Sequence, residues 1–216
     1  MRVDLRAASV VLVASFVAFS PPAVRAARDR DRQTQTPLAA GEVAVTIDTA
    51  LGRIVLAIDT AHAPITAANF LKYVDGGFYN GGRFHRATRP DNYTPAPPNR
   101  PPMELIQGGI NPARRADAQA FGTIALERTS VTGLKHVVGT VSMARGAAAD
   151  TATSDFFILL DEQPSLDFGG KRFDDAQGGA AFGRVIAGLD VVRKIQQQPV
   201  TQQNLTPPVL IQTMAR

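Results

Sequence analysis

The chain has 216 residues, enough for one domain that buries most of its apolar surface without covalent cross-links. It has no cysteine, which excludes a disulfide framework, a thiol nucleophile and a thiolate metal site. The formal net charge is +4, but the first 26 residues hold three arginines and one aspartate, so removing them leaves +2. No basic helix interleaved with aromatic residues is present, and nucleic-acid binding is not expected.

The first 26 residues have the order of features found in a secretory signal peptide. Arg2 and Arg6 supply a basic start, residues 7–19 are uncharged and mostly apolar, and Ser20-Pro21-Pro22 then breaks the run. Small residues precede a cut after Ala26, which predicts a mature chain that is periplasmic or secreted. A retained anchor is the alternative, but the apolar run is shorter than the ~20 residues that span a bilayer.

Residues 27–41 are predicted to form a flexible linker. Arginine and aspartate alternate from Arg28 to Arg32, and polar or small residues follow over 33–40. The hydrophobic pattern changes at Glu42, so the folded domain is predicted over residues 42–216. Once the leader is cleaved, no stable membrane insertion is expected, and the domain is expected to be a monomer.

The folded part begins with an apolar alternation that is typical of β-strands. Apolar residues alternate with polar or small ones over 43–47 and again over 54–58. This period of two predicts a pair of antiparallel strands. From Pro64, apolar residues recur at helical spacing until Gly76-Gly77, which predicts a helix packed across a barrel mouth.

Short β-rich segments, bounded by glycine, proline or polar turns, make up most of the remainder. A second amphipathic helix is expected over 189–195. The strands are expected at 139–144, 155–160, 181–185 and 209–212. Many short strands with two helices predict a mainly β fold with a closed barrel and argue against an alternating α/β sheet.

Six short motifs are more informative as an ordered set than any one of them alone. They are Phe84-His85-Arg86, Ile106-Gln107-Gly108-Gly109, Gly139-Thr140-Val141-Ser142-Met143-Ala144, Ser154-Asp155-Phe156-Phe157-Ile158, Leu166-Asp167 and Phe182-Gly183-Arg184-Val185. In their order and approximate spacing, from about Val43 to Thr213, the chain resembles the cyclophilin family of peptidyl-prolyl cis-trans isomerases. The resemblance implies a closed eight-stranded antiparallel β-barrel capped by two α-helices, with a proline-binding groove on its outer surface. With the leader, it suggests an exported bacterial member with loop insertions.

The resemblance also implies roles for particular positions. Arg86 corresponds to the catalytic arginine, and Gln107 to the glutamine that orients it and contacts the substrate. The residues implied in substrate binding are Phe157, Leu166, Leu105, Met143, Ala144 and Arg145. An arginine is always protonated, so it can donate to the prolyl nitrogen once the amide twists and that nitrogen regains its lone pair. The implied partners are proline-containing peptides and proteins that are unfolded or still folding.

Each of these motif residues also has a structural interpretation. An arginine in a β-rich protein is usually solvated or salt-bridged, and two adjacent phenylalanines are usually core. The ordered motifs favour functional roles for Arg86 and Phe157, whereas Phe156 is expected to point into the barrel by strand alternation. Gly108-Gly109 is expected to form a turn with positive φ.

Active sites of other kinds have little support in the sequence. His62, His85 and His136 show no paired metal-ligand spacing, so no metal is expected, and no other cofactor is expected either. Ser142 and Ser154 lack the nucleophile elbow of serine hydrolases. His85 is therefore interpreted as a structural hydrogen-bonding residue.

The chain departs from the family pattern at several positions. A proline-rich insertion at 89–102 separates Arg86 from Gln107, and it is expected to lie beside the groove. Glu104 falls where a pocket phenylalanine is usual, and its carboxylate is expected to shrink the apolar surface or pair with Arg86. Asp155 replaces a groove-lining glutamine, and Ser165 stands where many relatives carry a tryptophan. The loop at 169–180 is expanded.

Two functions follow as hypotheses. The first is a peptidyl-prolyl cis-trans isomerase that accelerates rotation about X-Pro bonds in exported proteins as they fold. The second is a chaperone or scaffold module that binds proline-containing segments with weak or no catalysis. The motif residues Arg86, Gln107 and Phe157 favour catalysis, whereas Glu104 and the insertion favour binding alone.

Overall fold

The computed structural model describes residues 36–92 and 101–216. The expected signal peptide, residues 27–35 of the expected linker and residues 93–100 of the expected insertion lie outside the described residues. Within the described ranges, the strands are β1 (Glu42–Thr49), β2 (Gly52–Asp59), β3 (Arg83–Thr88), β4 (Leu105–Gly109), β5 (Thr140–Met143), β6 (Phe156–Leu159), β7 (Ala180–Ala187), β8 (Val200–Thr201) and β9 (Asn204–Ala215). The α-helices are α2 (Pro64–Asp75), α3 (Arg115–Ala118), α4 (Thr129–Thr132) and α5 (Leu189–Gln196).

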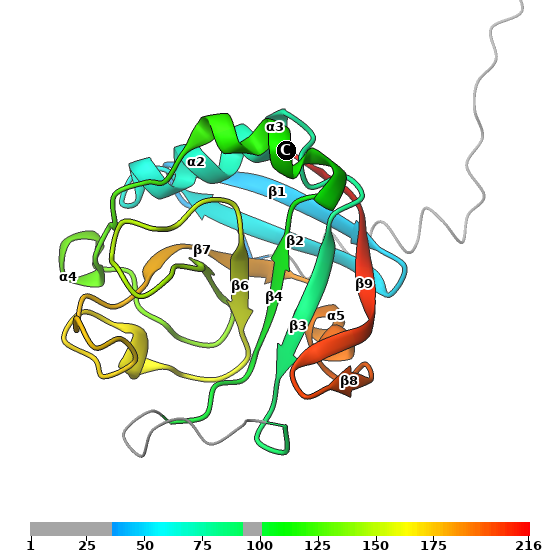
Figure 1. Cartoon of the computed structure of the whole chain (residues 1–216). Helices are drawn as coiled ribbons and strands as arrows, with labels where there is room; N and C mark the ends of the chain where they lie inside the picture. Colours follow the sequence, from blue (N-terminus) through cyan, green and yellow to red (C-terminus); the bar gives the residue numbers. More distant parts are fainter. Residues whose placement is uncertain (1–35, 93–100) are drawn as a thin grey trace, which may run out of the picture. The chain divides into compact units, whose positions relative to one another are not determined.

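Eight of the described strands close into an antiparallel barrel (Figure 1). Their order around the barrel is β1-β2-β7-β5-β6-β4-β3-β9, and a pairing between β1 and β9 completes the circle. The two-residue strand β8 pairs only with β9 and forms a small hairpin at the barrel rim. Closure removes the exposed sheet edges. The expectation of a closed eight-stranded barrel is confirmed.

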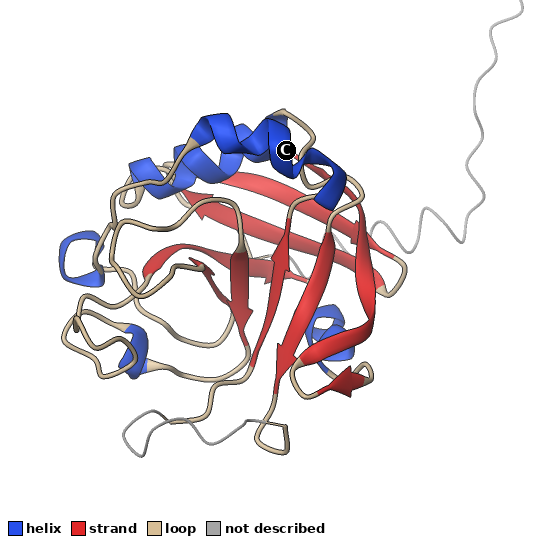
Figure 2. Cartoon of the chain, viewed as in Figure 1, coloured by secondary structure: helices blue, strands red, loops and turns tan. Residues whose placement is uncertain are grey.

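The two longer helices cover different parts of the barrel (Figure 2). α2 packs against β2, β7 and β9, whereas α5 packs against β2, β3 and β4. α2 begins with a proline at its first turn, and the Glu127 carboxylate accepts hydrogen bonds from the Ile65 and Thr66 backbone amides at 3.0 and 2.7 Å. These bonds satisfy two of the amides that a helix N-terminus leaves unpaired. Both helices lie where the apolar spacing predicts them.

Aromatic rings fill the interior of the barrel beneath α2. Phe70 of the helix lies 5.1 to 5.4 Å, centroid to centroid, from Tyr79, Phe156 and Phe182. Phe84 meets Phe156 edge to face at 5.9 Å. Phe156 therefore points into the core, as strand alternation predicts, and is fully buried.

The expected turn at Gly108-Gly109 is wrong, because both glycines lie within β4 and neither has a positive φ. They are needed for close approach. A Cβ on Gly108 would lie 2.9 Å from the Phe84 ring, and one on Gly109 would lie 2.3 Å from the Asp155 carboxylate. Glycine at these positions lets a core ring and a surface carboxylate press against the strand.

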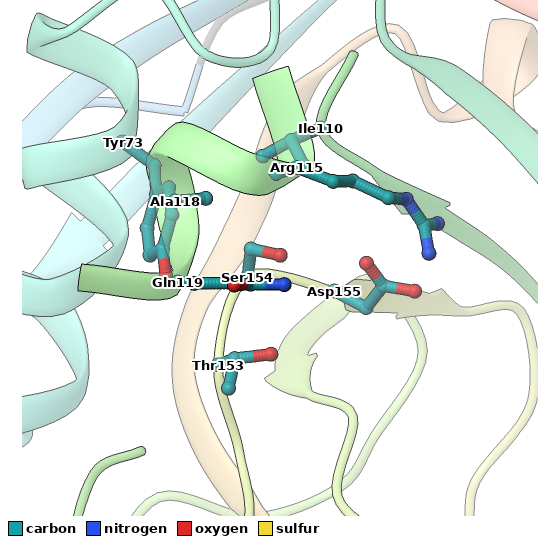
Figure 3. Close-up of a pocket in the computed structure, with 8 residues that line it drawn as sticks. All are labelled: Tyr73, Ile110, Arg115, Ala118, Gln119, Thr153, Ser154 and Asp155. Atoms are coloured by element: carbon teal, nitrogen blue, oxygen red, sulfur yellow. The ribbon is translucent and has the colours of Figure 1, made fainter. Parts of the chain in front are cut away.

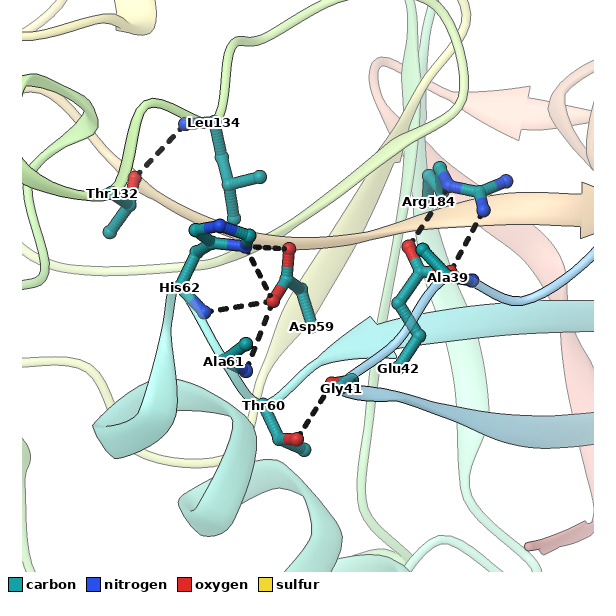
Figure 4. A network of polar contacts seen from close by, with 10 residues as sticks. All are labelled: Ala39, Gly41, Glu42, Asp59, Thr60, Ala61, His62, Thr132, Leu134 and Arg184. Carbon is teal, nitrogen blue, oxygen red and sulfur yellow. Dashed lines mark hydrogen bonds and ion pairs between the residues drawn. The ribbon is translucent and has the colours of Figure 1, made fainter.

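The described part of the expected linker is held against the barrel and does not hang free. The Thr36 amide donates to the Ile186 carbonyl at 3.2 Å, and the Arg184 guanidinium binds both the Pro37 carbonyl and the Glu42 carboxylate. Figure 4 shows the Glu42 carboxylate between Ala39 and Arg184. The ordered domain thus begins before residue 42.

Within residues 36–92 and 101–216, no helix is both long and apolar enough to cross a lipid bilayer.

Replacing the inward-facing Phe156 with alanine should lower the free energy of unfolding by about 3–5 kcal/mol, because it removes a ring that contacts three others and leaves a cavity. Urea unfolding followed by circular dichroism measures the change. Leu210→Ala is the matched control, since Leu210 is half exposed on β9 and should change stability by about 0.5 kcal/mol or less. Equal effects of the two substitutions would contradict the inward placement.

Candidate active site on the outer face of the barrel

Strand pairing aligns three predicted site residues in one row across the barrel wall. Arg86 of β3 is paired with Gln107 of β4, and Gln107 is paired with Phe157 of β6. Adjacent strands lie about 4.8 Å apart, so Arg86 and Phe157 are separated by roughly 10 Å. Residues far apart in the sequence thus meet in one short stretch of the surface.

A β-bulge at His85 determines where Arg86 points. The register advances two residues on β3, from Phe84 to Arg86, while β4 advances only one, from Gly108 to Gln107. Phe84 and Ala87 are both buried in the core, whereas His85 and Arg86 are part-exposed. Regular alternation from Phe84 would turn Arg86 inward, so the extra residue re-aims the arginine toward the outer face.

Two glutamines hold the guanidinium of Arg86. Its Nε and Nη2 donate to Gln203 Oε1 at 2.9 and 2.6 Å, and its Nη1 donates to Gln107 Oε1 at 3.2 Å. Gln203 lies in the turn between β8 and β9, and its backbone carbonyl also accepts from the Ala87 amide at 2.9 Å. These bonds fix the plane of the guanidinium.

A second apolar cluster, separate from the barrel core, lies beside this row. We call it the outer apolar cluster, and it brings together three predicted pocket residues, Leu105, Phe157 and Leu166. Alternation explains the arrangement, because Leu105 and Phe157 face outward while their neighbours Ile106 and Phe156 belong to the core. Its remaining buried members are Met103 and Leu159, with Ala144 and Phe173 packed against its edge.

His136 supports the outer apolar cluster from below. Its ring stacks on Phe157 at 6.5 Å between centroids, with 17° between the planes. Its Nδ1 lies 2.9 Å from Asp167 Oδ1, and its Nε2 lies 3.0 Å from Ser142 Oγ. Burial would raise the pKa of Asp167, but its hydrogen bonds to the His136 side chain and backbone outweigh that effect and lower the pKa. His136 is therefore a positioning residue for Phe157.

The predicted peptide-binding edge is divided by the structure. Met143 is buried in the barrel core, so its side chain does not line the outer face, and its expected role in substrate binding is wrong in that respect. Ala144 contacts the outer apolar cluster. Within the described residues, the backbone amide and carbonyl of Arg145 make no hydrogen bond, which leaves them available to an extended peptide.

The Arg145 side chain is buried and ties down the loop at 169–180. Its guanidinium stacks 3.5 Å from the centroid of the Phe173 ring, donates to the Gly178 carbonyl at 2.8 Å and pairs with Asp175 at 2.8 Å. The hydrogen bond from Arg145 is the main cause that lowers the pKa of Asp175. The expanded loop is thus attached to the edge of the cluster.

The structure shows the surroundings of two departures from the family pattern, Ser165 and Glu104. Ser165 bonds to Gln163, and Phe173 supplies an aromatic ring at the edge of the cluster in a chain that has no tryptophan. Glu104 accepts a hydrogen bond from Gln196 of α5 at 3.3 Å, and Met103 takes a place in the apolar cluster. The expected loss of apolar surface at Glu104 is therefore not found.

Sequence reasoning missed Gln203, Met103 and Phe173. Gln203 lies in a turn 117 positions after Arg86, where no periodic pattern marks a side chain. Met103 directly follows the inserted loop and Phe173 lies within the expanded loop, so motif spacing could not place them. Their one detectable signal is that each is an apolar residue in an otherwise polar or proline-rich stretch.

Polar and charged groups gather on the other side of the row. His85 Nε2 lies 3.8 Å from Asp155 Oδ2. Asp155 and Arg115 both line a hollow of about 330 Å³. Figure 3 shows these two side chains among the residues around it. Burial lowers the pKa of His85; the Asp155 carboxylate opposes this effect, while Arg115 and Arg86 add to it. The lowered pKa favours the neutral imidazole of His85. No group of three potential metal ligands occurs in the described parts of the chain.

The sequence model of the cyclophilin-type peptidyl-prolyl cis-trans isomerases matches residues 43–216. The chain belongs to the cyclophilin family. It is a peptidyl-prolyl cis-trans isomerase, an activity that its similarity to curated family members also supports.

Bacterial cyclophilins are among its relatives. The chain is 34% identical over 214 residues to peptidyl-prolyl cis-trans isomerase A of Dickeya dadantii, covering 95% of this chain and 94% of that one. It is 36% identical over 157 residues to an isomerase of Acinetobacter baylyi, covering 73% of each chain. A solved Cryptosporidium parvum cyclophilin superimposes with a TM-score of 0.60 at 20% identity, covering 81% of this chain and 96% of that one. That structural likeness concerns the fold alone.

Replacing Arg145 with alanine should release the loop at 169–180 while the barrel stays folded. Amide hydrogen exchange over residues 172–177 should accelerate at least about tenfold, because the stacking on Phe173 and the bonds to Asp175 and Gly178 are lost together. Lys171→Ala is the control, since this exposed cation lies in the same loop. Unchanged exchange in the Arg145 variant would show that the loop does not depend on this contact.

Proposed function

We propose that the cyclophilin accelerates rotation about X-Pro bonds in exported proteins as they fold, with Arg86 as the catalytic residue. One observation carries the proposal: a guanidinium held by three hydrogen bonds stands beside an apolar cluster on the outer face of the barrel. A fixed cation next to an apolar surface fits a prolyl ring and the amide nitrogen attached to it.

Rotation about the prolyl amide requires a hydrogen-bond donor that acts near the transition state. Amide resonance gives the bond a barrier of about 18–20 kcal/mol. As the bond twists, the prolyl nitrogen becomes pyramidal and regains its lone pair, so Arg86 can donate to it only near the transition state. A charge-assisted hydrogen bond of about 3 kcal/mol confined to that state corresponds to roughly a hundredfold in rate.

Positioning supplies the remainder of the catalysis. The prolyl ring is assigned to the outer apolar cluster around Phe157, Leu105 and Leu166. The side chain of Gln107 is assigned to contact the bound peptide and to orient Arg86. The backbone of Arg145 is assigned to hydrogen-bond the main chain of the peptide. An apolar environment around the twisting amide also disfavours its planar form, which is the more polar one. The guanidinium is already held in place, so it does not have to reorganise during the reaction.

The binding-only hypothesis loses one of its two arguments. It rests on a Glu104 carboxylate in the pocket, whereas this carboxylate accepts a hydrogen bond from Gln196 of α5. The other argument, the insertion, falls largely on residues 93–100, which lie outside the described part of the chain. We therefore favour catalysis over binding alone.

Replacing Arg86 with alanine should lower kcat/KM for a short prolyl peptide about a hundredfold, and Arg86→Lys should also be poor, since an ammonium lacks the planar donor geometry. Gln203→Ala should cost about tenfold, mainly in kcat, because the guanidinium loses two of its three glutamine bonds. Exchange spectroscopy on the peptide measures turnover.

Gln202→Asn is the matched control for Gln203, because asparagine tolerates the positive φ of 59° at this neighbouring exposed position. Melting temperatures close to that of the wild type would show that the variants are folded. Wild-type turnover by Arg86→Ala would refute the catalytic assignment. Peptide binding by the wild type without acceleration would restore the chaperone hypothesis.

The proposal that the protein is exported depends only on the predicted signal peptide. The mature chain should begin at Ala27 in the periplasm or the medium, because small residues precede that bond and a short apolar run precedes them. Mass spectrometry of the native N-terminus checks this. Ala26→Arg should block the cut and cause the precursor to accumulate. A mature cytoplasmic protein that keeps Met1 would contradict export.

A further inference from the structure

A hollow of about 420 Å³ lies next to the catalytic row, on the side opposite the outer apolar cluster. Arg83, His85, Gly109, Arg115 and Asn204 contribute to its lining. It is not part of the proline pocket, because none of its lining residues belongs to the outer apolar cluster.

The lining of the hollow holds two arginines, Arg83 and Arg115. The side chains of Arg83 and Arg115 make no ion pair or hydrogen bond within the described residues, whereas the side chain of the adjacent Arg114 is paired with Asp117 at 2.8 Å. The lining includes no carboxylate. The Asp155 carboxylate lies beside two of the lining residues, against Gly109 and 3.8 Å from His85 Nε2. The lining therefore contributes two arginines, and Asp155 lies at its edge.

The strand geometry places this charge within reach of a bound peptide. On β4, Leu105 of the outer apolar cluster and Gly109 of the hollow lie on opposite sides of Gln107, each two residues away. Two residues of strand span about 6.7 Å, so the proline pocket and the hollow are roughly 13 Å apart. Extended peptide covers about 3.4 Å per residue, and an acidic side chain adds to that reach.

We propose that this hollow is a subsite for an acidic side chain, two or three residues from the proline of a peptide substrate. The carboxylate binds between Arg83 and Arg115, and the Asn204 side chain completes the polar wall. The subsite deepens the proposed function and rests on the assignment of Arg86 and Gln107 to the substrate. It would make the isomerase favour X-Pro bonds in acidic segments.

Peptide pairs that differ only by glutamate or glutamine, at each position from three before to three after the proline, test the proposal. The wild type should show about a threefold to tenfold higher kcat/KM for glutamate at one or two positions. The preference should fall in 0.5 M salt, because the arginines are exposed and the interaction is screened. Asp155→Asn should raise the preference, since it removes the competing carboxylate.

The double variant Arg83→Gln and Arg115→Gln should lose the preference and keep wild-type turnover of the glutamine peptides. Lys194→Gln on α5, which removes one charge elsewhere on the surface, should keep the preference. Should the double variant melt early, the single variant Arg115→Gln, altered on an exposed short helix, gives the same test. No preference at any position, or a preference that survives both arginine substitutions, would overturn the subsite.

Failure of the subsite is distinct from failure of the proposed function. Without the subsite, glutamine and glutamate peptides are turned over equally and Arg86→Ala still abolishes most of that turnover. Without the proposed function, Arg86→Ala leaves the turnover of both peptides unchanged.

Discussion

The single extra residue at His85 sets the outward direction of Arg86, and the candidate site depends on it. Phe84 and Ala87 must stay in the core, and only a bulge between them allows two consecutive side chains to face outward. The bulge also puts His85 beside the charged hollow while Arg86 reaches the glutamines. One irregularity in the ladder therefore positions both sides of the row.

Adjacent residues of one strand in the barrel wall contribute to the core and to the candidate site in turn. Phe156 packs with the rings beneath α2, while Phe157, its neighbour, belongs to the outer apolar cluster above His136. Because successive side chains on a strand point to opposite faces, the inner face is constrained by core packing, whereas the outer face packs against loops and carries the candidate site. The short strands around the site carry both requirements without conflict.

Periodicity and motif order predicted the hairpin, both long helices, the barrel and the inward direction of Phe156, because each depends on local alternation or helical spacing. They also brought Arg86, Gln107 and Phe157 together through the family resemblance. They could not assign Met143 to the core or find Gln203, because these placements depend on register and on pairing between distant segments. The error at Gly108-Gly109 has a similar cause. A glycine pair in a sequence can indicate either a turn with positive φ or a close tertiary contact, and here the contacts with Phe84 and Asp155 require glycine. Phe173 was missed because its position depends on the length and path of the loop, which periodicity does not predict.

Because the Arg86 guanidinium is held by Gln203, the candidate site is complete only after the ribosome has made residues near the C-terminal end of the domain. Gln203 directly precedes β9, and β9 is the strand that pairs with both β1 and β3 to complete the barrel. A nascent chain that has made Arg86, Gln107 and Phe157 but not this final segment has neither a closed wall nor the principal partner of its guanidinium. The apolar cluster's residues are all made earlier. The candidate site is therefore complete only after the last strand of the barrel has been made and paired.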